Sequence, residues 1–213
     1  MMSGTTKKLL SLLGRQPVIP VLKIEDAGAA VPLARALAAG GLPMIEITLR
    51  TGAALEAIRR VAAEVESAVV GAGTILNAGQ FADAAKAGSR FIVSPGCSAS
   101  VFAAARDSDV PLLPGAITPG EIMTAAEQGL DFLKFFPAEQ AGGTAFLKAL
   151  ASPFAGIRFC PTGGVAADNA REYLALPNVT CVGGSWVAPD SLVKAGAWST
   201  IEALAREASG LSA

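Results

Sequence analysis

Short apolar runs alternate with segments of helical period along most of the chain. The apolar runs are rich in Val, Ile and Phe, as buried parallel strands usually are, and cover residues 17–22, 44–49, 68–74, 90–94, 111–116, 131–135, 157–161 and 179–182. Ala-rich segments with the period of amphipathic helices cover residues 27–39, 53–65, 78–87, 98–107, 119–128, 144–151, 166–174 and 200–208. Strands that alternate with helices indicate parallel βα units.

Eight such units predict an α/β fold with one closed (β/α)8 TIM barrel, although such barrels more often have about 250 residues. The competing fold is a doubly wound open sheet, which a G-x-G-x-x-G motif after the first strand would favour, and the chain has none there. No linker or low-complexity tract interrupts residues 1–213, so we expect a single domain. Residues 7–13 faintly imitate a signal peptide, but the apolar stretch is short, so we expect an N-terminal helix.

Composition narrows the class of protein. The 213 residues are 52% hydrophobic, which is enough for one full-size core, and 17 basic against 18 acidic residues leave a net charge of -1. Because the charges are mixed, nothing indicates nucleic-acid binding, and no uninterrupted apolar stretch is long enough to predict a membrane span. The three cysteines (Cys97, Cys160 and Cys181) match no metal or disulfide spacing, so we expect reduced thiols and a cytoplasmic protein.

The chain contains no histidine. This absence excludes Ser-His-Asp and Cys-His catalysis, and it removes the ligand on which most catalytic zinc sites depend. Any acid–base chemistry must therefore use Glu, Asp, Lys, Tyr, Cys or water.

Lys134 stands in the apolar run DFLKFFP of residues 131–137. A charged amine among aromatic side chains costs several kcal/mol or loses its proton. An uncharged lysine is a nucleophile that can form a Schiff base with a ketone. The alternative interpretation is a lysine whose amine reaches water at the end of the strand.

The second strand carries polar residues on one face. Because side chains alternate along a strand, Glu46, Thr48 and Arg50 share a face, which we expect to point into the barrel. A buried carboxylate needs a partner or a function, so a structural ion pair between Glu46 and Arg50 competes with catalysis. If Lys134 also points inward, its amine lies near this carboxylate, as in a Schiff-base lysine with a general base beside it.

Paired glycines follow the seventh and eighth strands, at Gly163-Gly164 and Gly183-Gly184. In many barrels this position binds phosphate through backbone N–H groups at the start of a short helix. The pairs therefore predict a phosphorylated substrate, and the alternative is two tight turns. Thr74 and Pro95, at the ends of the third and fourth strands, are weaker candidates for the same binding site at the carboxyl ends of the strands.

Several stretches resemble the class I aldolases that cleave 2-keto-3-deoxy-6-phosphogluconate in the Entner–Doudoroff pathway, and the related 4-hydroxy-2-oxoglutarate aldolases. The matching stretches are MIEITLRT (44–51), VGAGTIL (70–76), FIVSPG (91–96), FLKFFPAEQAGG (132–143), IRFCPTGGV (157–165) and VGGSWV (182–187). They follow the family's order. The first 16 residues show no match.

The resemblance implies a role for each candidate residue. Lys134 is expected to form the Schiff base with pyruvate, Glu46 to move protons, and Arg50 and Thr74 to hold the pyruvate carboxylate. The remaining residues are expected to line the pocket, contact the middle of the substrate and hold its phosphate, and they are Pro95, Phe136, Thr162, Gly163, Gly164, Gly184 and Ser185. The resemblance also implies a homotrimer that needs no metal or other cofactor.

Two other functions are compatible with parts of the pattern. A phosphate-binding isomerase, epimerase or synthase would share the glycine pairs but would not require Lys134 beside Glu46. A non-catalytic ligand-binding barrel would bind phosphate and tolerate replacement of Lys134. Trapping with borohydride separates both from an aldolase.

Overall fold

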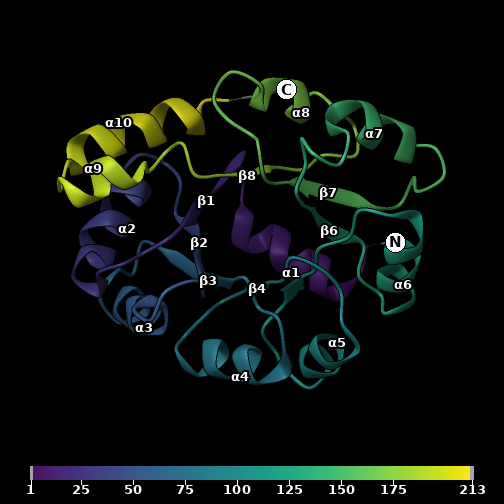
Figure 1. The fold of residues 1–213 in the computed structure, drawn as a ribbon, viewed down its shortest axis with the longest axis horizontal. Helices are drawn as coiled ribbons and strands as arrows, with labels where there is room; N and C mark the ends of the chain where they lie inside the picture. The colour runs from purple at the N-terminus through teal and green to yellow at the C-terminus, as the bar shows by residue number, and fades with distance from the viewer. Residues whose placement is uncertain (1, 212–213) are drawn as a thin grey trace.

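The structure is a computed structural model that describes residues 2–211. Its strands curl around the N-terminal helix and the other helices lie outside them (Figure 1), and we call this curled arrangement of strands the ring. The strands are β1 (Val18–Leu22), β2 (Met44–Thr48), β3 (Val69–Gly73), β4 (Ile92–Val93), β5 (Leu112–Leu113), β6 (Phe132–Phe135), β7 (Arg158–Pro161) and β8 (Val182–Gly184). The helices are α1 (Gly4–Leu13), η1 (Ala27–Ala29), α2 (Ala30–Ala39), α3 (Ala54–Glu64), α4 (Ala78–Lys86), α5 (Ala99–Arg106), α6 (Pro119–Glu127), α7 (Gly143–Leu150), α8 (Ala170–Leu174), α9 (Asp190–Lys194) and α10 (Trp198–Ser209).

Every strand pairing is parallel. Six strands form one sheet in the order β5-β4-β3-β2-β1-β8, and β6 pairs with β7. Isolated parallel bridges join the two sheets, from Gly115 to Lys134 on one side and from Thr162 to Gly183 on the other. The molecule is thus an α/β fold with a curled parallel sheet, a coarser description than the closed barrel predicted from the sequence.

Several predicted boundaries are wrong. The strands expected at 90–94 and 111–116 are shorter, because β4 and β5 have two residues each. The eighth strand was expected at 179–182, but β8 runs from Val182 to Gly184, because the glycines pair with β1. The helix expected at 166–174 begins only at Ala170, because the Ala166 N–H donates to Asn169 Oδ1 in a preceding turn. The short helix α9 was not predicted.

The N-terminal helix is confirmed, and it covers the end of the ring from which the strands start. Leu9 and Leu13 of α1 belong to an inner apolar cluster with residues of the strands, among them Ile19, Met44 and Phe132. In Figure 1 α1 crosses the middle of the ring. Burying these leucines fills the interior at this end of the ring.

Asp131, just before β6, forms hydrogen bonds with the start of α1. Its carboxylate accepts from the Ser3 N–H at 3.0 Å, the Ser3 hydroxyl at 2.8 Å and the Thr6 hydroxyl. Burial raises the pKa of Asp131, but the hydrogen bonds from Thr6 and Ser3 outweigh burial and lower it. The carboxylate is therefore stabilised in its charged form.

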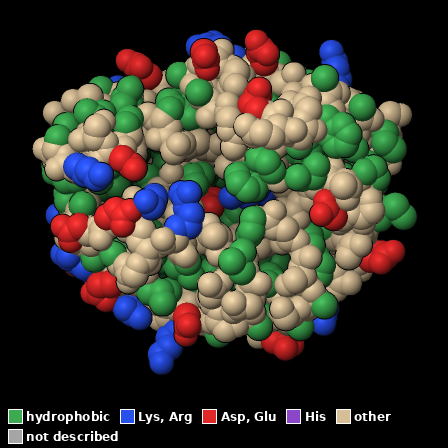
Figure 2. Space-filling view, viewed as in Figure 1, with side chains coloured by type: hydrophobic (Ala, Val, Ile, Leu, Met, Phe, Trp, Pro, Cys, Tyr) green, Lys and Arg blue, Asp and Glu red, His purple; other side chains and the backbone are tan. Residues whose placement is uncertain are grey.

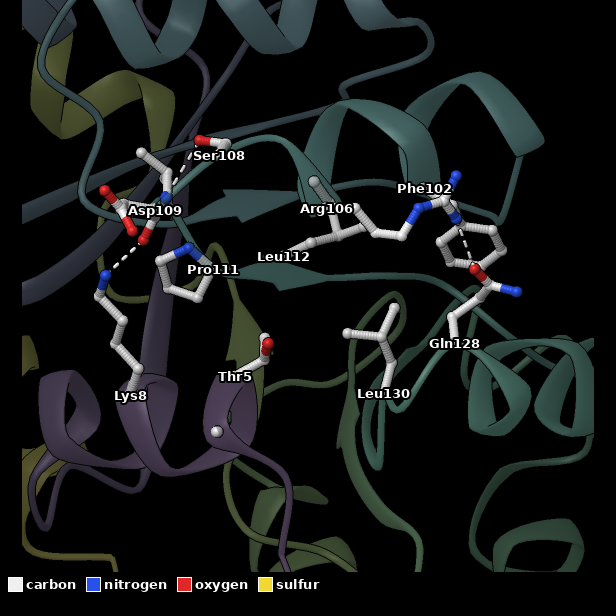
Figure 3. Close-up of a pocket in the computed structure, with 13 residues that line it drawn as sticks. Thr5, Lys8, Phe102, Arg106, Ser108, Asp109, Pro111, Leu112, Gln128 and Leu130 are labelled. Atoms are coloured by element: carbon white, nitrogen blue, oxygen red, sulfur yellow. Dashed lines mark hydrogen bonds between the residues drawn. The ribbon is translucent and has the colours of Figure 1, made fainter.

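A cavity of about 260 Å³ lies beside α1 at the same N-terminal end (Figure 3). Its two basic side chains have partners: Arg106 Nη1 donates to Gln128 Oε1 at 2.7 Å, and Lys8 Nζ donates to the backbone carbonyl of Asp109. The cavity lies at the opposite end of the strands from the candidate catalytic residues.

Within residues 2–211, no helix has both the length and the apolar character that crossing a membrane requires.

Candidate active site

Lys134 and Glu46 come together inside the ring. Parity along β6 places Phe132 and Lys134 inward, and Leu133 and Phe135 pack outward. Lys134 Nζ lies 3.1 Å from Oε1 and 3.4 Å from Oε2 of Glu46, and the two residues are only 6% and 3% exposed. The amine therefore does not reach out to water, and a proton can pass directly between the two groups.

The predicted alternative, a pair between Glu46 and Arg50, is not formed. Arg50 is exposed, and its Nε donates to Thr48 Oγ1 at 3.0 Å. Thr48 in turn donates to the Leu22 carbonyl at 2.8 Å. This chain of contacts holds Arg50 at the end of β2, with most of its guanidinium donors free.

Gly73 makes the space that the Glu46 carboxylate occupies. A Cβ added at Gly73 would lie 2.0 Å from Glu46 Oε1 and 2.6 Å from its Cδ. Sequence reasoning allowed a close approach at the glycines of this strand but did not identify what approaches. The sequence feature that could have identified this contact is the glycine on β3, because β3 pairs with β2 in parallel register.

Phe136 lies between the amine and the loop after β7. Its ring centroid is 5.4 Å from Lys134 Nζ, within range of a cation–π interaction. A Cβ on Gly163 would come within 3.0 Å of the same ring. Phe136 is 37% exposed, so one part of its ring is available to a ligand.

Thr74 and Pro95 are at the same rim as Arg50, because the three residues follow the carboxyl ends of the neighbouring strands β2, β3 and β4. Thr74 and Pro95 are half-buried. Thr74 has φ +61°, a conformation that costs a β-branched residue energy and that is concentrated at functional sites. Basic and acidic side chains also meet near the centre of the face shown in Figure 2.

The loop after β7 contains backbone N–H groups that have no protein acceptor among residues 2–211. Gly163 and Gly164 have φ +92° and +77°, which favours glycine. Three successive carbonyls of the loop accept hydrogen bonds. The Thr162 and Gly163 carbonyls accept from the N–H groups of Ala138 and Glu139, and the Gly164 carbonyl accepts from Asn169 Nδ2. Within residues 2–211 the N–H groups of Gly164 and Val165 meet no protein acceptor, and free backbone donors of this kind can hold an anion.

The loop after β8 lies beside this one. Thr162 is buried, and a Cβ on Gly183 would come within 2.3 Å of its hydroxyl oxygen. Gly184 is buried under the ring of Trp186, whereas Ser185 is exposed. The structure therefore brings the two glycine pairs to the same rim, on the side of the ring next to β6.

All three cysteines are free thiols. Cys97 follows β4, and its Sγ donates to the Gly115 carbonyl at 3.0 Å. Burial, and to a lesser degree Glu121, raises the pKa of the Cys97 thiol to about 11. The pKa of Cys181 is raised by a hydrogen bond with Cys160 and by burial, so Cys97 and Cys181 are poor nucleophiles at neutral pH.

Among residues 2–211, no three His, Cys, Asp or Glu side chains come together in a group that could hold a metal ion.

Comparison with known proteins places this geometry in a family. The sequence model of the family described as KDPG and KHG aldolase matches residues 9–204. The chain belongs to this aldolase family. The match begins at residue 9, so it includes part of the N-terminal segment in which no resemblance was visible.

Relatives in the KDPG and KHG aldolase family are similar over almost the whole chain. The KHG/KDPG aldolase of Escherichia coli (strain K12) is 48% identical over 198 residues, which is 93% of each chain. The 2-keto-3-deoxy-6-phosphogluconate aldolase of Zymomonas mobilis ZM4, solved with 3-phosphoglycerate, is 48% identical, has a TM-score of 0.89 and is matched over 95% of each chain.

A third relative bears on the chemistry. The KDPG aldolase of Legionella pneumophila was solved with pyruvate captured at low pH as a covalent carbinolamine intermediate. Its structure superposes with a TM-score of 0.91 at 42% identity and covers 94% of this chain and 97% of its own. A carbinolamine is the adduct that forms when an amine attacks a ketone, so Schiff-base chemistry occurs in this family.

Proposed function

We propose that this protein is a class I aldolase that reversibly cleaves 2-keto-3-deoxy-6-phosphogluconate to pyruvate and glyceraldehyde 3-phosphate. The observation that carries the proposal is the buried contact of 3.1 Å between Lys134 Nζ and Glu46 Oε1. The name of the 48% identical Zymomonas mobilis relative supports the substrate. The name of the Escherichia coli relative, KHG/KDPG aldolase, favours 4-hydroxy-2-oxoglutarate as a second substrate.

Lys134 supplies the electron sink. Its amine, after giving a proton to Glu46, attacks the C2 carbonyl of the substrate to form a carbinolamine, which loses water to leave a protonated imine. The C4 hydroxyl then loses its proton, the C3–C4 bond breaks, and its electrons move into the imine to give an enamine. Protonation of the enamine at C3 and hydrolysis release pyruvate and free Lys134.

Glu46 moves the protons of these steps. It is within direct reach of Nζ and is held in place by the space at Gly73. Arg50 offers a planar pair of N–H donors that matches a carboxylate, and Thr74 lies on the neighbouring strand, so the two bind the carboxylate of pyruvate. Pro95 and Phe136 line the pocket, and the Thr162 hydroxyl contacts the middle of the substrate.

The phosphate binds where the free N–H groups are. The donors of the loop after β7, together with Gly184 and Ser185 after β8, surround it. This contact is remote from the bond that breaks, so its binding energy helps to position the reacting atoms.

The assembly and setting belong to the same proposal. We propose that the two sheets close into a (β/α)8 barrel, that three copies form a homotrimer as the resemblance implies, and that the enzyme is cytoplasmic and metal-free. Size-exclusion chromatography with light scattering tests the trimer. Activity that survives extensive chelation tests the absence of a metal.

Trapping of the imine tests the chemistry. The protein is incubated with pyruvate and sodium borohydride, and the adduct is mapped by peptide mass spectrometry. We expect one pyruvate-derived increment on Lys134 and loss of activity. The Lys134→Arg variant is the control, because a guanidinium stays protonated and cannot form the imine. Absence of an adduct in the folded wild-type protein would refute the Schiff-base mechanism.

A further inference from the structure

Glu139 contacts the loop after β7, which contains the N–H groups without a protein acceptor within residues 2–211. It is five residues beyond Lys134, in the connection between β6 and α7, and its own N–H donates to the Gly163 carbonyl at 3.1 Å. Its side chain passes directly beneath Gly164, where an added Cβ would lie 2.4 Å from Glu139 Cγ and 2.6 Å from Glu139 Cβ. The Glu139 side chain, although exposed, therefore fills the space that a side chain at Gly164 would need.

Tyr173 holds that side chain in place. Its hydroxyl donates to Glu139 Oε1, and the residue is fully buried in α8. Burial, and then the hydrogen bond to Glu139, raises the pKa of Tyr173, so the hydroxyl keeps its proton at any physiological pH. A Cβ on Gly143 would come within 3.3 Å of the same hydroxyl oxygen, so the segment around α7 also leaves space for this contact.

The contacts of Glu139 explain the unusual conformation of the loop. Two successive glycines with positive φ lose much conformational freedom when they are fixed, so an unsupported loop would sample many orientations of its N–H groups. The backbone of Glu139 fixes one carbonyl of the loop, and its side chain packs against Gly164. These contacts hold the loop in one conformation before any ligand arrives, and in that conformation the N–H groups of Gly164 and Val165 have no acceptor within residues 2–211.

We propose that Glu139, held by Tyr173, is a positioning residue that preorganises the N–H groups of the loop after β7 for the phosphate of the substrate. This inference rests on the proposed function, because it requires that the phosphate binds at this loop. Glu139 acts through the loop backbone and does not touch the reacting atoms. One oxygen of its carboxylate, Oε1, accepts from the Tyr173 hydroxyl.

The test compares reactions that need the phosphate with reactions that do not. Steady-state cleavage of 2-keto-3-deoxy-6-phosphogluconate and of unphosphorylated 4-hydroxy-2-oxoglutarate is measured, together with proton exchange at the methyl group of pyruvate. The full-length Glu139→Ala variant should raise KM for the phosphorylated substrate about 10-fold, the usual scale for losing a good hydrogen-bonded contact. Its pyruvate exchange and its KM for 4-hydroxy-2-oxoglutarate should stay within about twofold of wild type.

Three other variants give the experiment its controls. Glu139→Gln keeps the packing under Gly164 and an acceptor for Tyr173, so it should restore KM to near the wild-type value. Tyr173→Phe removes only the hydroxyl and should raise KM for the phosphorylated substrate several-fold. Glu172→Ala removes an exposed charge next to Tyr173 without touching the loop, so it should leave every reaction unchanged.

Each other outcome has a definite meaning. An unchanged KM in Glu139→Ala would overturn the role of Glu139, and so would an equal loss in pyruvate exchange, since that indicates a general structural defect. A Glu139→Gln variant as impaired as Glu139→Ala would show that the charge matters instead of the position. If the wild-type protein does not favour the phosphorylated substrate, the proposed phosphate site itself is wrong, which is a different failure.

Discussion

Replacing Gly73 with alanine should disable Glu46 without changing any proposed catalytic group. The added Cβ would lie 2.0 Å from Glu46 Oε1, whereas an ordinary contact needs at least 3.4 Å, so the carboxylate must retreat by about 1.4 Å. A displacement of that size is larger than the range of distances that a hydrogen bond tolerates, so it breaks the 3.1 Å contact with Lys134 Nζ. Misplacement of a catalytic group by about 1 Å can cost about 100-fold in rate.

The cost in stability is smaller than the cost in rate. Overpacking by a methyl group costs about 1–3 kcal/mol, and the reduced freedom of the unfolded chain returns about 0.4–1 kcal/mol of this, because Gly73 does not have a positive φ. The net loss of about 0–2.5 kcal/mol is less than the usual stability of a domain, so the variant should fold.

Gly71→Ala is the matched control. Gly71 lies two residues earlier on the same face of β3, and its added Cβ would meet the ring of Phe91 at 2.4 Å instead of the carboxylate. Both variants are assayed for proton exchange at the pyruvate methyl group and for unfolding in urea. We expect similar losses of stability, with exchange about 100-fold slower only in Gly73→Ala. Equal exchange rates in the two variants would refute the idea that Gly73 sets the position of Glu46.

Three further predictions test separate parts of the structure. Glu46→Gln should slow pyruvate proton exchange by about 100-fold or more, and an unchanged rate would place the base elsewhere, such as on a bound water. Alkylation of Cys97 by iodoacetamide should be slow at pH 8 and accelerate as the pH approaches about 11, whereas a fast reaction at neutral pH would contradict the raised pKa of this thiol. Asp131→Asn should weaken the attachment of α1 and lower the free energy of unfolding by about 1 kcal/mol at neutral pH. Because the pKa of Asp131 is lowered in the folded state, the wild-type advantage should be present above about pH 4 and disappear as the pH falls through that lowered pKa, and an advantage that persists in stronger acid would refute it.

Alternation along single strands was sufficient to predict which side chains face inward. The pattern MIEITLR placed Glu46 and Thr48 opposite Ile45 and Ile47, and the structure has this arrangement, because parity along an extended strand is a local property. Strand boundaries were less predictable. The eighth strand was displaced toward the glycines because its pairing partner, β1, decides where it begins.

Contacts between distant segments could not be predicted from the pattern. The sequence does not show that Gly73 leaves space for the Glu46 carboxylate. It also does not show that Arg50 donates to Thr48 instead of pairing with Glu46, or that Glu139 accepts from Tyr173. Each of these depends on a separation across neighbouring strands or loops, and such separations are set by the whole packed ring.

The sequence by itself determined the alternation of strands and helices, the position of Lys134 within an apolar strand, and the chemistry left by the absence of histidine. These features follow from residue type and from periodicity along one segment. Only the tertiary structure decided the partner of that lysine and the residues that bond the carbonyls of the glycine loop. Those properties depend on which side chains fill the space next to a backbone, and close packing fixes that choice only when all the strands are assembled.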